Sequence, residues 1–232
     1  MLIDIYGSRS NLMSLFTVNT DTNIVVSNIF IGTTIESQNC KETIINEERM
    51  NDITSPYELI ELHTDMSKRL RKFNSYVKSN VIILDFLHEG RESIKFKNGT
   101  LVNRPVLRRY GYSQGNGQIL SLDNKIKNIE KYVDDLINYI EPYDLVIINK
   151  LRNPKWTKDD NQRSVRVDDL ESINFLNYYA ETFEDVLASK RKNIRIIPEF
   201  KSLNQLEKGY QNESDYLNFL GYHLDNILKE EN

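Results

Sequence analysis

The distribution of apolar residues along the chain is the first guide to its fold. Five short apolar runs are separated by polar or helical stretches, and all but the alternating first run are largely continuous and rich in Val and Ile. They cover residues 2–6, 24–31, 81–87, 145–149 and 194–197. Continuous apolar runs of this length are typical of strands that are buried on both faces of a parallel sheet. The pattern therefore predicts five strands.

Between these runs, apolar residues recur at spacings of three or four and predict amphipathic helices. A short helix is predicted directly after the first strand, and longer ones cover residues 56–77, 126–140, 170–187 and 217–228. Ser55 and Pro56 suit the N-cap and the first position of the first long helix. The alternation of strands and helices predicts one α/β domain, a parallel sheet with helices on both faces.

Two segments are less regular. Residues 97–117 hold four glycines and form an irregular insertion, for which we expect a hairpin or flap over the end of the sheet. Residues 156–166 are polar, and we expect a loop there.

Composition limits the partners of the chain. Its 232 residues hold 30 Lys and Arg against 34 Asp and Glu, and the net charge of −4 gives no electrostatic footprint for nucleic acid. We expect the basic clusters at residues 68–72 and 190–192 to be solvated helix faces or helix ends. The apolar runs are far shorter than the roughly 18 residues of a membrane-spanning helix, so we expect no membrane span.

Cysteine and histidine are scarce. The single Cys40 excludes an internal disulfide and a cysteine-based zinc cage, and the three histidines form no pair at metal-binding spacing. We therefore expect neither a metal nor another cofactor. The amino-terminal sequence lacks the basic and long apolar segments of a secretory signal, so we expect a cytoplasmic protein.

The residues that follow the predicted strands are the candidates for function, because ligands of open parallel sheets bind at the carboxyl ends of the strands. Gly7 and Ser8 directly follow the first strand. A serine at such a turn can act as a nucleophile, because the N–H groups that begin a helix can hold developing negative charge. The simpler alternative is that Ser8 or Ser10 caps the helix and Gly7 permits the turn.

A serine nucleophile needs a base, and histidine is the usual one. His63 lies within the 56–77 helical pattern, and we expect it on a helix flank. His88 follows the third strand and is a candidate for the site. His223 lies after the fifth strand, where a base could approach Ser8; its alternative role is helix capping or packing.

The order of these residues resembles the SGNH (GDSL-type) hydrolase superfamily, and more closely a bacterial branch of SGNH-like proteins. The matching residues are Gly7-Ser8, Asp85 with Glu89 and Arg91, and Tyr222-His223. The resemblance implies a three-layer α/β/α sandwich with a five-stranded parallel sheet. It also implies acyl transfer in which Ser8 is the nucleophile and His223 is the base.

Three positions depart from the superfamily pattern. Leu220 stands where an Asp commonly precedes the histidine by three residues, and Asp215 or Asp85 could supply the missing acid. Residues 85–88 replace the usual Gly-x-Asn-Asp, whose asparagine donates to the oxyanion. Arg9 follows Ser8 in place of the usual Asp.

Further strand-end residues are candidates for substrate binding. The oxyanion donors could be the N–H groups of Ser8 and Gly32 and the side chains of His88 or Asn149. Arginines suit an anionic group of the substrate because guanidinium presents a planar, bidentate fork. The arginines near predicted strand ends are Arg9, Arg91 and Arg152. Alternatively, Glu89 and Arg91 simply pair with each other.

The sequence leaves two main hypotheses. The first is a serine esterase or acyltransferase of SGNH type, acting on a small molecule or on acylated glycans or cell-envelope polymers. The second is a non-catalytic SGNH-like binding or assembly protein, which the residue at Leu220 and the missing Gly-x-Asn-Asp favour. A nucleotide-binding doubly wound protein is a third, weaker alternative, because the Gly7 turn lacks both glycine-rich phosphate motifs.

Overall fold

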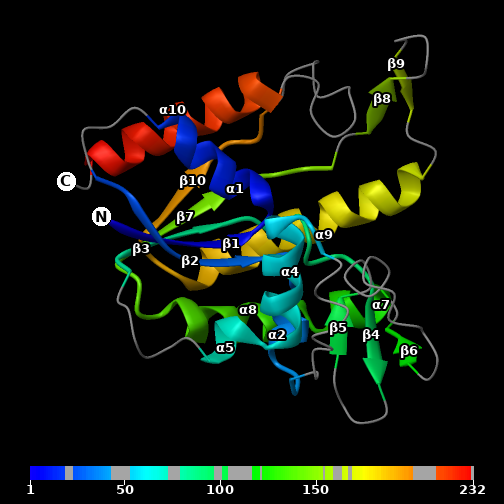
Figure 1. Ribbon diagram of the computed structural model, residues 1–232. Coiled ribbons are helices and arrows are strands. Elements are labelled where there is room, and N and C mark those ends of the chain that lie inside the picture. The colour runs from blue at the N-terminus through cyan, green and yellow to red at the C-terminus, as the bar shows by residue number, and fades with distance from the viewer. Residues whose placement is uncertain are drawn as a thin grey trace.

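A five-stranded, wholly parallel sheet lies at the centre of the protein. The computed structural model describes residues 1–18, 23–42, 53–72, 79–96, 101–103, 117–120, 122–153, 155–158, 164–166, 169–200 and 213–230. The strands are β1 (Leu2–Gly7), β2 (Val25–Ile31), β3 (Val81–Leu84), β7 (Leu145–Asn149) and β10 (Ile194–Ile197). Their order across the sheet is β10-β7-β3-β1-β2 (Figure 1). The five predicted strands are confirmed, although β3 is shorter than predicted because the chain leaves the sheet at Asp85.

Helices cover both faces of this sheet, which explains why its strands are continuously apolar. One face carries α1 (Arg9–Ser14) and α10 (Glu213–Glu230), and the other carries α8 (Ile129–Ile140) and α9 (Leu170–Lys190) (Figure 1). Neighbouring residues of one strand serve opposite faces: Ile83 packs in the cluster that contains Leu220 of α10, whereas Ile82 packs with Val133 of α8. The fold is therefore a three-layer α/β/α sandwich, as predicted.

The prediction of one continuous helix over residues 56–77 is wrong. The segment forms two helices, α4 (Pro56–Met66) and α5 (Arg69–Lys72), separated by Lys68, whose backbone is left-handed (φ 52°). Lys68 is also buried, against the expectation of a solvated basic cluster. Its Nζ donates to Ser37 Oγ and to the backbone oxygen of Leu101, both at 2.6 Å. These inward contacts explain why the helix ends here, and residues 73–77 lie outside the described part of the chain.

The other helices match their predicted positions with changes at the ends. The 126–140 helix is divided at Asn128 into α7 (Leu122–Lys127) and α8, and both α9 and α10 extend beyond their predicted bounds. The described part of the chain also contains two short elements, the 3-10 helix η1 (Leu15–Thr17) and α2 (Ile35–Gln38).

Two small antiparallel sheets lie outside the central one. The strands β4 (Ser93–Phe96), β5 (Leu101–Asn103) and β6 (Gly117–Ile119) form one of them, although most of the 97–117 insertion lies outside the described residues. The second consists of β8 (Trp156–Lys158) and β9 (Ser164–Arg166), so the expectation of a loop there is wrong. Trp, Thr and Val in these segments are types that favour strands.

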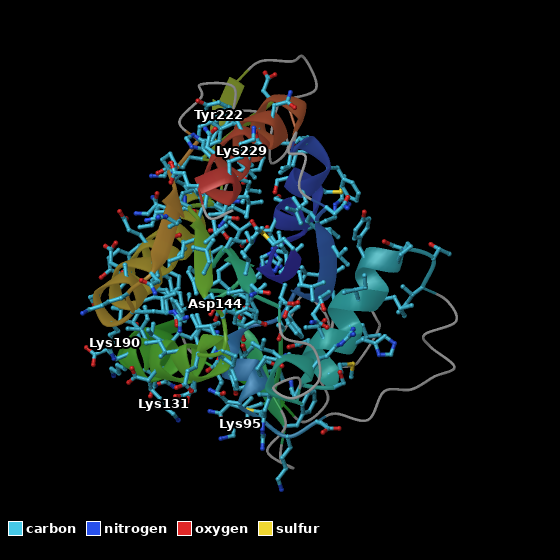
Figure 2. All side chains as sticks on the ribbon, turned by 90° about the vertical axis from the view of Figure 1, so that its left-hand side faces the viewer. Lys95, Lys131, Asp144, Lys190, Tyr222 and Lys229 are labelled. Atoms are coloured by element: carbon cyan, nitrogen blue, oxygen red, sulfur yellow. The ribbon has the colours of Figure 1, made fainter. Side chains whose placement is uncertain are left out.

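Charged side chains mark the outer surfaces of the helical layers. Figure 2 shows Lys131 and Lys190 on the α8 and α9 side and Lys229 on α10. Lys190 pairs with Asp134 at 2.6 Å, in keeping with the expected exposed helix end. No helix in the described part of the chain is long and apolar enough to cross a membrane.

Candidate functional site

The carboxyl ends of β1, β3 and β7 bring three of the candidate residues to one edge of the sheet. Tyr6 pairs with Leu84, and Leu84 pairs in turn with Ile148. The next residues along these strands are Gly7, Asp85 and Asn149, which therefore lie in a row. Ser8 follows directly and begins the turn into α1.

Gly7 is required at this turn. Its backbone is left-handed (φ 113°), and a Cβ atom built there would lie 2.4 Å from the backbone oxygen of Asp85. Gly32 is similar, with φ 73° and a Cβ position 2.4 Å from the side chain of Glu61. The N–H of Gly32 donates to the backbone oxygen of Gly7 at 3.1 Å. A backbone hydrogen bond thus links the ends of β1 and β2, and both of its residues adopt conformations that require glycine.

Ser8 pairs with Asp85 rather than with a histidine. Both the backbone N and Oγ of Ser8 donate to the same carboxylate oxygen, Asp85 Oδ2, at 2.7 and 2.8 Å. The other oxygen, Oδ1, accepts from the N–H of Leu87 at 3.2 Å. Burial raises the pKa of Asp85 to about 6, and the hydrogen bonds from Ser8 and Leu87 limit this rise. Ser8 occupies the N-cap position of α1, but its side chain does not cap the helix.

Two asparagines span the end of β3 beside this pair. Asn11 Nδ2 donates to the backbone oxygen of Tyr6 at 3.1 Å, and Asn11 Oδ1 accepts from Asn149 Nδ2 at 2.8 Å. Asn149 Nδ2 also lies 3.5 Å from the hydroxyl oxygen of Tyr216 on α10. Asn149 was expected at the site, whereas no role was predicted for Asn11 or Tyr216.

The structure does not bring His223 to Ser8. The helix α10 runs back along the sheet, and His223 lies seven residues beyond Tyr216, which corresponds to about 10 Å along the helix axis. Its ring packs against the rings of Phe219 and Tyr222, with centroids 4.5 and 5.4 Å away. Partial burial lowers the pKa of His223. The hydrogen bonds of Ser8 in the described part of the chain all go to Asp85.

Asp215 does not take the role of orienting acid. It lies eight residues before His223 on the same helix, a separation of about 12 Å along the axis. An orienting carboxylate must be within hydrogen-bonding reach of the imidazole. The predicted set of Ser8, His223 and Asp215 is therefore not assembled.

The remaining candidates near the strand ends have partners of their own. His88 Nδ1 lies 3.4 Å from a guanidinium nitrogen of Arg91, and the guanidinium of Arg9 lies 4.9 Å above the ring of Tyr57. Arg152 makes a bidentate ion pair with the buried Glu184 of α9, at 2.8 and 2.7 Å. All three arginines thus contact other side chains of the protein, and an anion site at these residues stays a prediction.

Glu89 is buried and does not pair with Arg91. Its carboxylate accepts hydrogen bonds from the hydroxyl of Tyr6 and from the N–H of Ile35, the latter at 3.1 and 3.2 Å for the two oxygens. Burial raises the pKa of Glu89 to about 7. Glu89 therefore links the carboxyl end of β1 to the start of α2, and it is part of a larger polar network.

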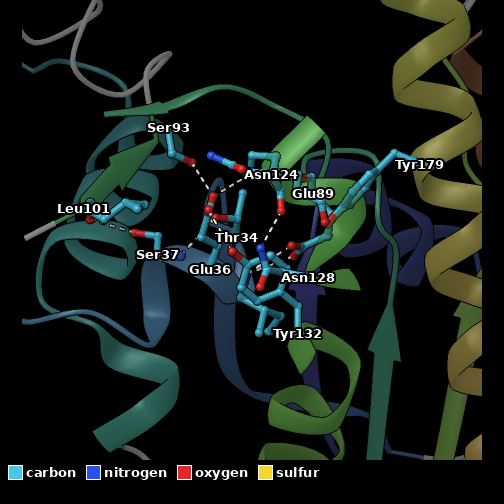
Figure 3. A network of polar contacts seen from close by, with 12 residues as sticks. Thr34, Glu36, Ser37, Glu89, Ser93, Leu101, Asn124, Asn128, Tyr132 and Tyr179 are labelled. Carbon is cyan, nitrogen blue, oxygen red and sulfur yellow. Dashed lines mark hydrogen bonds and ion pairs between the residues drawn. The ribbon is translucent and has the colours of Figure 1, made fainter. Parts of the chain in front are cut away.

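Figure 3 shows this network, which sequence reasoning missed apart from Glu89. Glu36 of α2 accepts from Lys125 Nζ at 2.7 Å, from Ser93 Oγ at 3.0 Å and from the hydroxyl of Tyr132 at 2.9 Å. Lys125 also donates to the backbone oxygen of Glu89 at 3.1 Å. One signal was available: Lys125 precedes Ile129 by four residues and so continues the apolar stripe of α8, where a charged residue needs a buried partner.

Three of the four donors expected to form an oxyanion hole are bonded within the protein. The N–H of Ser8 binds Asp85, the N–H of Gly32 binds Gly7, and the side-chain amide of Asn149 binds Asn11. Stabilising an oxyanion requires donors that are aimed at the reacting oxygen. Chemically, the row of strand ends offers a serine hydroxyl on a carboxylate, and its backbone and amide donors are used within the protein.

Within the described residues, no group of three or more His, Cys, Asp and Glu side chains is placed to hold a metal ion. Comparison of the chain with protein-family models and with curated proteins gives no match. The function is therefore inferred from the geometry of the strand ends.

Proposed function

We propose that this chain is an SGNH-like protein with a binding or assembly role rather than an acyl-transfer enzyme. One observation carries the proposal: both donors of Ser8 are held by a single buried oxygen of Asp85. A serine nucleophile needs its hydroxyl directed to a base that can accept and later return the proton. The imidazole of His223, the base that the family resemblance implies, packs instead among aromatic rings of α10.

The electrostatics of Ser8 support the same proposal. During acyl transfer the backbone N–H of the nucleophile commonly faces the oxyanion. Here that N–H points to a carboxylate, 2.7 Å away. A negative charge developing on a substrate oxygen near Ser8 would be repelled by Asp85. The proposed ligand is a small molecule or a glycan. The proposed location is the cytoplasm, a reducing compartment that suits a chain with a single cysteine.

A second candidate is an SGNH-like esterase or acyltransferase in which Asp85 replaces histidine as the base. The 2.8 Å hydrogen bond from Ser8 Oγ to Asp85 Oδ2 favours it. In that reaction Ser8 Oγ would bond to the substrate carbonyl carbon while its proton moves to Asp85, which would then protonate the leaving group. A carboxylate with a pKa of about 6 is a reasonable base near neutral pH, but it would have to release the N–H of Ser8.

Covalent labelling with a fluorophosphonate separates the two candidates. The wild-type chain and the variants Ser8→Ala, Asp85→Asn and His223→Ala are incubated with the reagent, and intact masses are measured beside a control esterase. We expect no adduct on any of them when the control is fully labelled.

An adduct on the wild-type chain that disappears in Ser8→Ala would overturn the binding role. If that adduct is also lost in Asp85→Asn and kept in His223→Ala, the carboxylate-based enzyme is supported. Loss in His223→Ala would instead indicate that His223 reaches Ser8 in another conformation.

A further inference from the structure

The amide pair at the end of β3 has a fixed polarity. The backbone oxygen of Tyr6 is an acceptor, so Asn11 must direct its Nδ2 toward it, at 3.1 Å. Asn11 Oδ1 consequently faces Asn149, which must present its own Nδ2, at 2.8 Å. Rotating either amide by half a turn would place two oxygens or two NH₂ groups together. The orientation of Asn149 is thus set by the backbone of β1.

This polarity leaves Asn149 Oδ1 as an acceptor with no donor from the described part of the chain. The side chain of Asn149 is buried, with 1% of its surface exposed. Buried carbonyl oxygens are nearly always hydrogen-bonded, because leaving one unpaired destabilises the fold. An acceptor held in this way at the carboxyl edge of a parallel sheet lies where ligands of such folds bind.

The surroundings of Asn149 Oδ1 favour a neutral donor. Asp85 follows the neighbouring strand, and its carboxylate accepts hydrogen bonds from Ser8 and Leu87. Lys150 and Arg152 follow Asn149, and their charges are balanced by the carboxylate of Glu184. A charged group of a ligand would therefore be buried beside Asn149 without a counter-charge of its own. A hydroxyl group avoids this penalty.

We propose that Asn149 Oδ1 is the acceptor of a subsite for a hydroxyl group of a neutral, polyhydroxylated ligand. The inference deepens the proposed binding role and rests on it. The amide relay from Tyr6 through Asn11 to Asn149 orients the acceptor, and the occupied donors of Ser8 and Asn11 make the strand ends a poor site for a ligand that brings only acceptors.

The test is a titration followed by NMR of the side-chain amide groups of the full chain. Glucose, N-acetylglucosamine and mannitol are the probes, and permethylated glucose, which has no hydroxyl donor, is the matched ligand control. We expect a saturable shift of the Asn149 amide signal with at least one hydroxylated probe and none with the permethylated sugar. This ligand comparison does not depend on any variant.

Variants then locate the interaction. Asn149→Leu is expected to weaken binding at least about tenfold, in keeping with the loss of one hydrogen bond. Asn177→Leu is the matched control, because Asn177 makes a separate amide contact with Asn153 and should leave binding unchanged.

Each contrary result has a distinct meaning. No saturable shift with any hydroxylated probe at millimolar concentrations overturns the subsite, as does equal binding of the permethylated sugar or by Asn149→Leu. A crystal structure grown with the sugars that shows water alone at Asn149 Oδ1 overturns it too. Labelling of Ser8 by the fluorophosphonate would instead overturn the non-catalytic role and leave the sugar titration to decide the subsite.

Discussion

A buried carboxylate lies near each end of β1, Asp4 within the strand and Asp85 beside its carboxyl end, directly after β3, and the two make different contacts. Near the amino end, Asp4 accepts hydrogen bonds from Asn28 at 2.8 Å, Ser79 at 2.6 Å and Tyr143 at 2.5 Å. These donors come from β2 and from the segments that lead into β3 and β7. At the carboxyl end, Asp85 takes its donors from Ser8 and from Leu87, only two residues away along the chain.

The difference separates Asp4, which links neighbouring strands, from Asp85, which lies among the candidate site residues. Asp4 accepts hydrogen bonds from three neighbouring segments and so links β1 to β2 and to the residues that precede β3 and β7. Asp85 satisfies the turns that follow β1 and β3, and the adjacent amide of Asn149 keeps an oxygen without a donor from the described residues. The polar groups around Asp4 at the amino edge therefore satisfy one another, whereas the carboxyl edge holds the acceptor of the subsite that we propose.

Replacing Asp4 by Ala should have the largest effect. The change leaves the donors of Asn28, Ser79 and Tyr143 buried without their acceptor, so we expect the free energy of unfolding to fall by about 4 kcal/mol. Urea denaturation followed by circular dichroism measures it. Asp144→Ala is the matched control at the same edge, because Asp144 is exposed (Figure 2) and should change stability by no more than about 0.5 kcal/mol. Equal effects of the two variants would show that the buried, hydrogen-bonded Asp4 contributes no more to stability than the exposed Asp144.

The pH dependence of stability should show the raised pKa values of Glu89 and Asp85, which lie near the carboxyl edge of the sheet. The folded-state pKa values of Glu89, about 7, and Asp85, about 6, lie above the ordinary values of 4.5 and 3.8. The folded state thus binds protons more tightly than the unfolded chain, and folding is favoured at low pH. This stabilisation is fully present below about pH 4 and is lost as the pH rises through 6 to 7.

Urea titrations between pH 4 and 8 check this expectation. Relative to Glu89→Gln, the wild-type chain should lose on the order of 3 kcal/mol over this range, following 1.36 kcal/mol per pKa unit. Asp85→Asn should remove its own part of the slope. Wild-type and variant curves that stay parallel across the range would show that neither carboxyl group has a raised pKa.

Much of the fold could be predicted, because a strand that is buried on both faces of a sheet has a continuously apolar sequence. Ile82 and Ile83 face opposite layers, so β3 had to be continuously apolar. The break in the 56–77 helix could not be predicted, because apolar spacing continues through it. Lys68 interrupts the helix by contacts with Ser37 and Leu101, which are distant in the sequence.

The candidate site was predicted only for residues that directly follow neighbouring strands, because the order of the strands brings them into contact. Ser8 and Asp85 follow neighbouring strands, so their meeting is a consequence of the sheet. The distance of His223 from Ser8 depends on where α10 begins and in which direction it runs. The residues around His223 predict neither of these. Asn11 was missed because its role depends on the orientation of an amide toward Tyr6, which no sequence pattern records.

Replacing Ser8 by Ala should have the smallest effect on stability and a specific effect on Asp85. The variant loses one hydrogen bond but keeps the backbone N–H of residue 8 on Asp85 Oδ2, so we expect a loss of about 1 kcal/mol. Because the Ser8 hydroxyl lowers the pKa of Asp85, its removal should raise that pKa above about 6, as measured by carboxyl ¹³C NMR. Ser10→Ala, two residues further along α1, should leave the Asp85 titration unchanged. An unchanged titration in Ser8→Ala as well would mean that the hydroxyl does not contact the carboxylate in solution, and the contrast between the two ends of β1 would then rest on Asp4 alone.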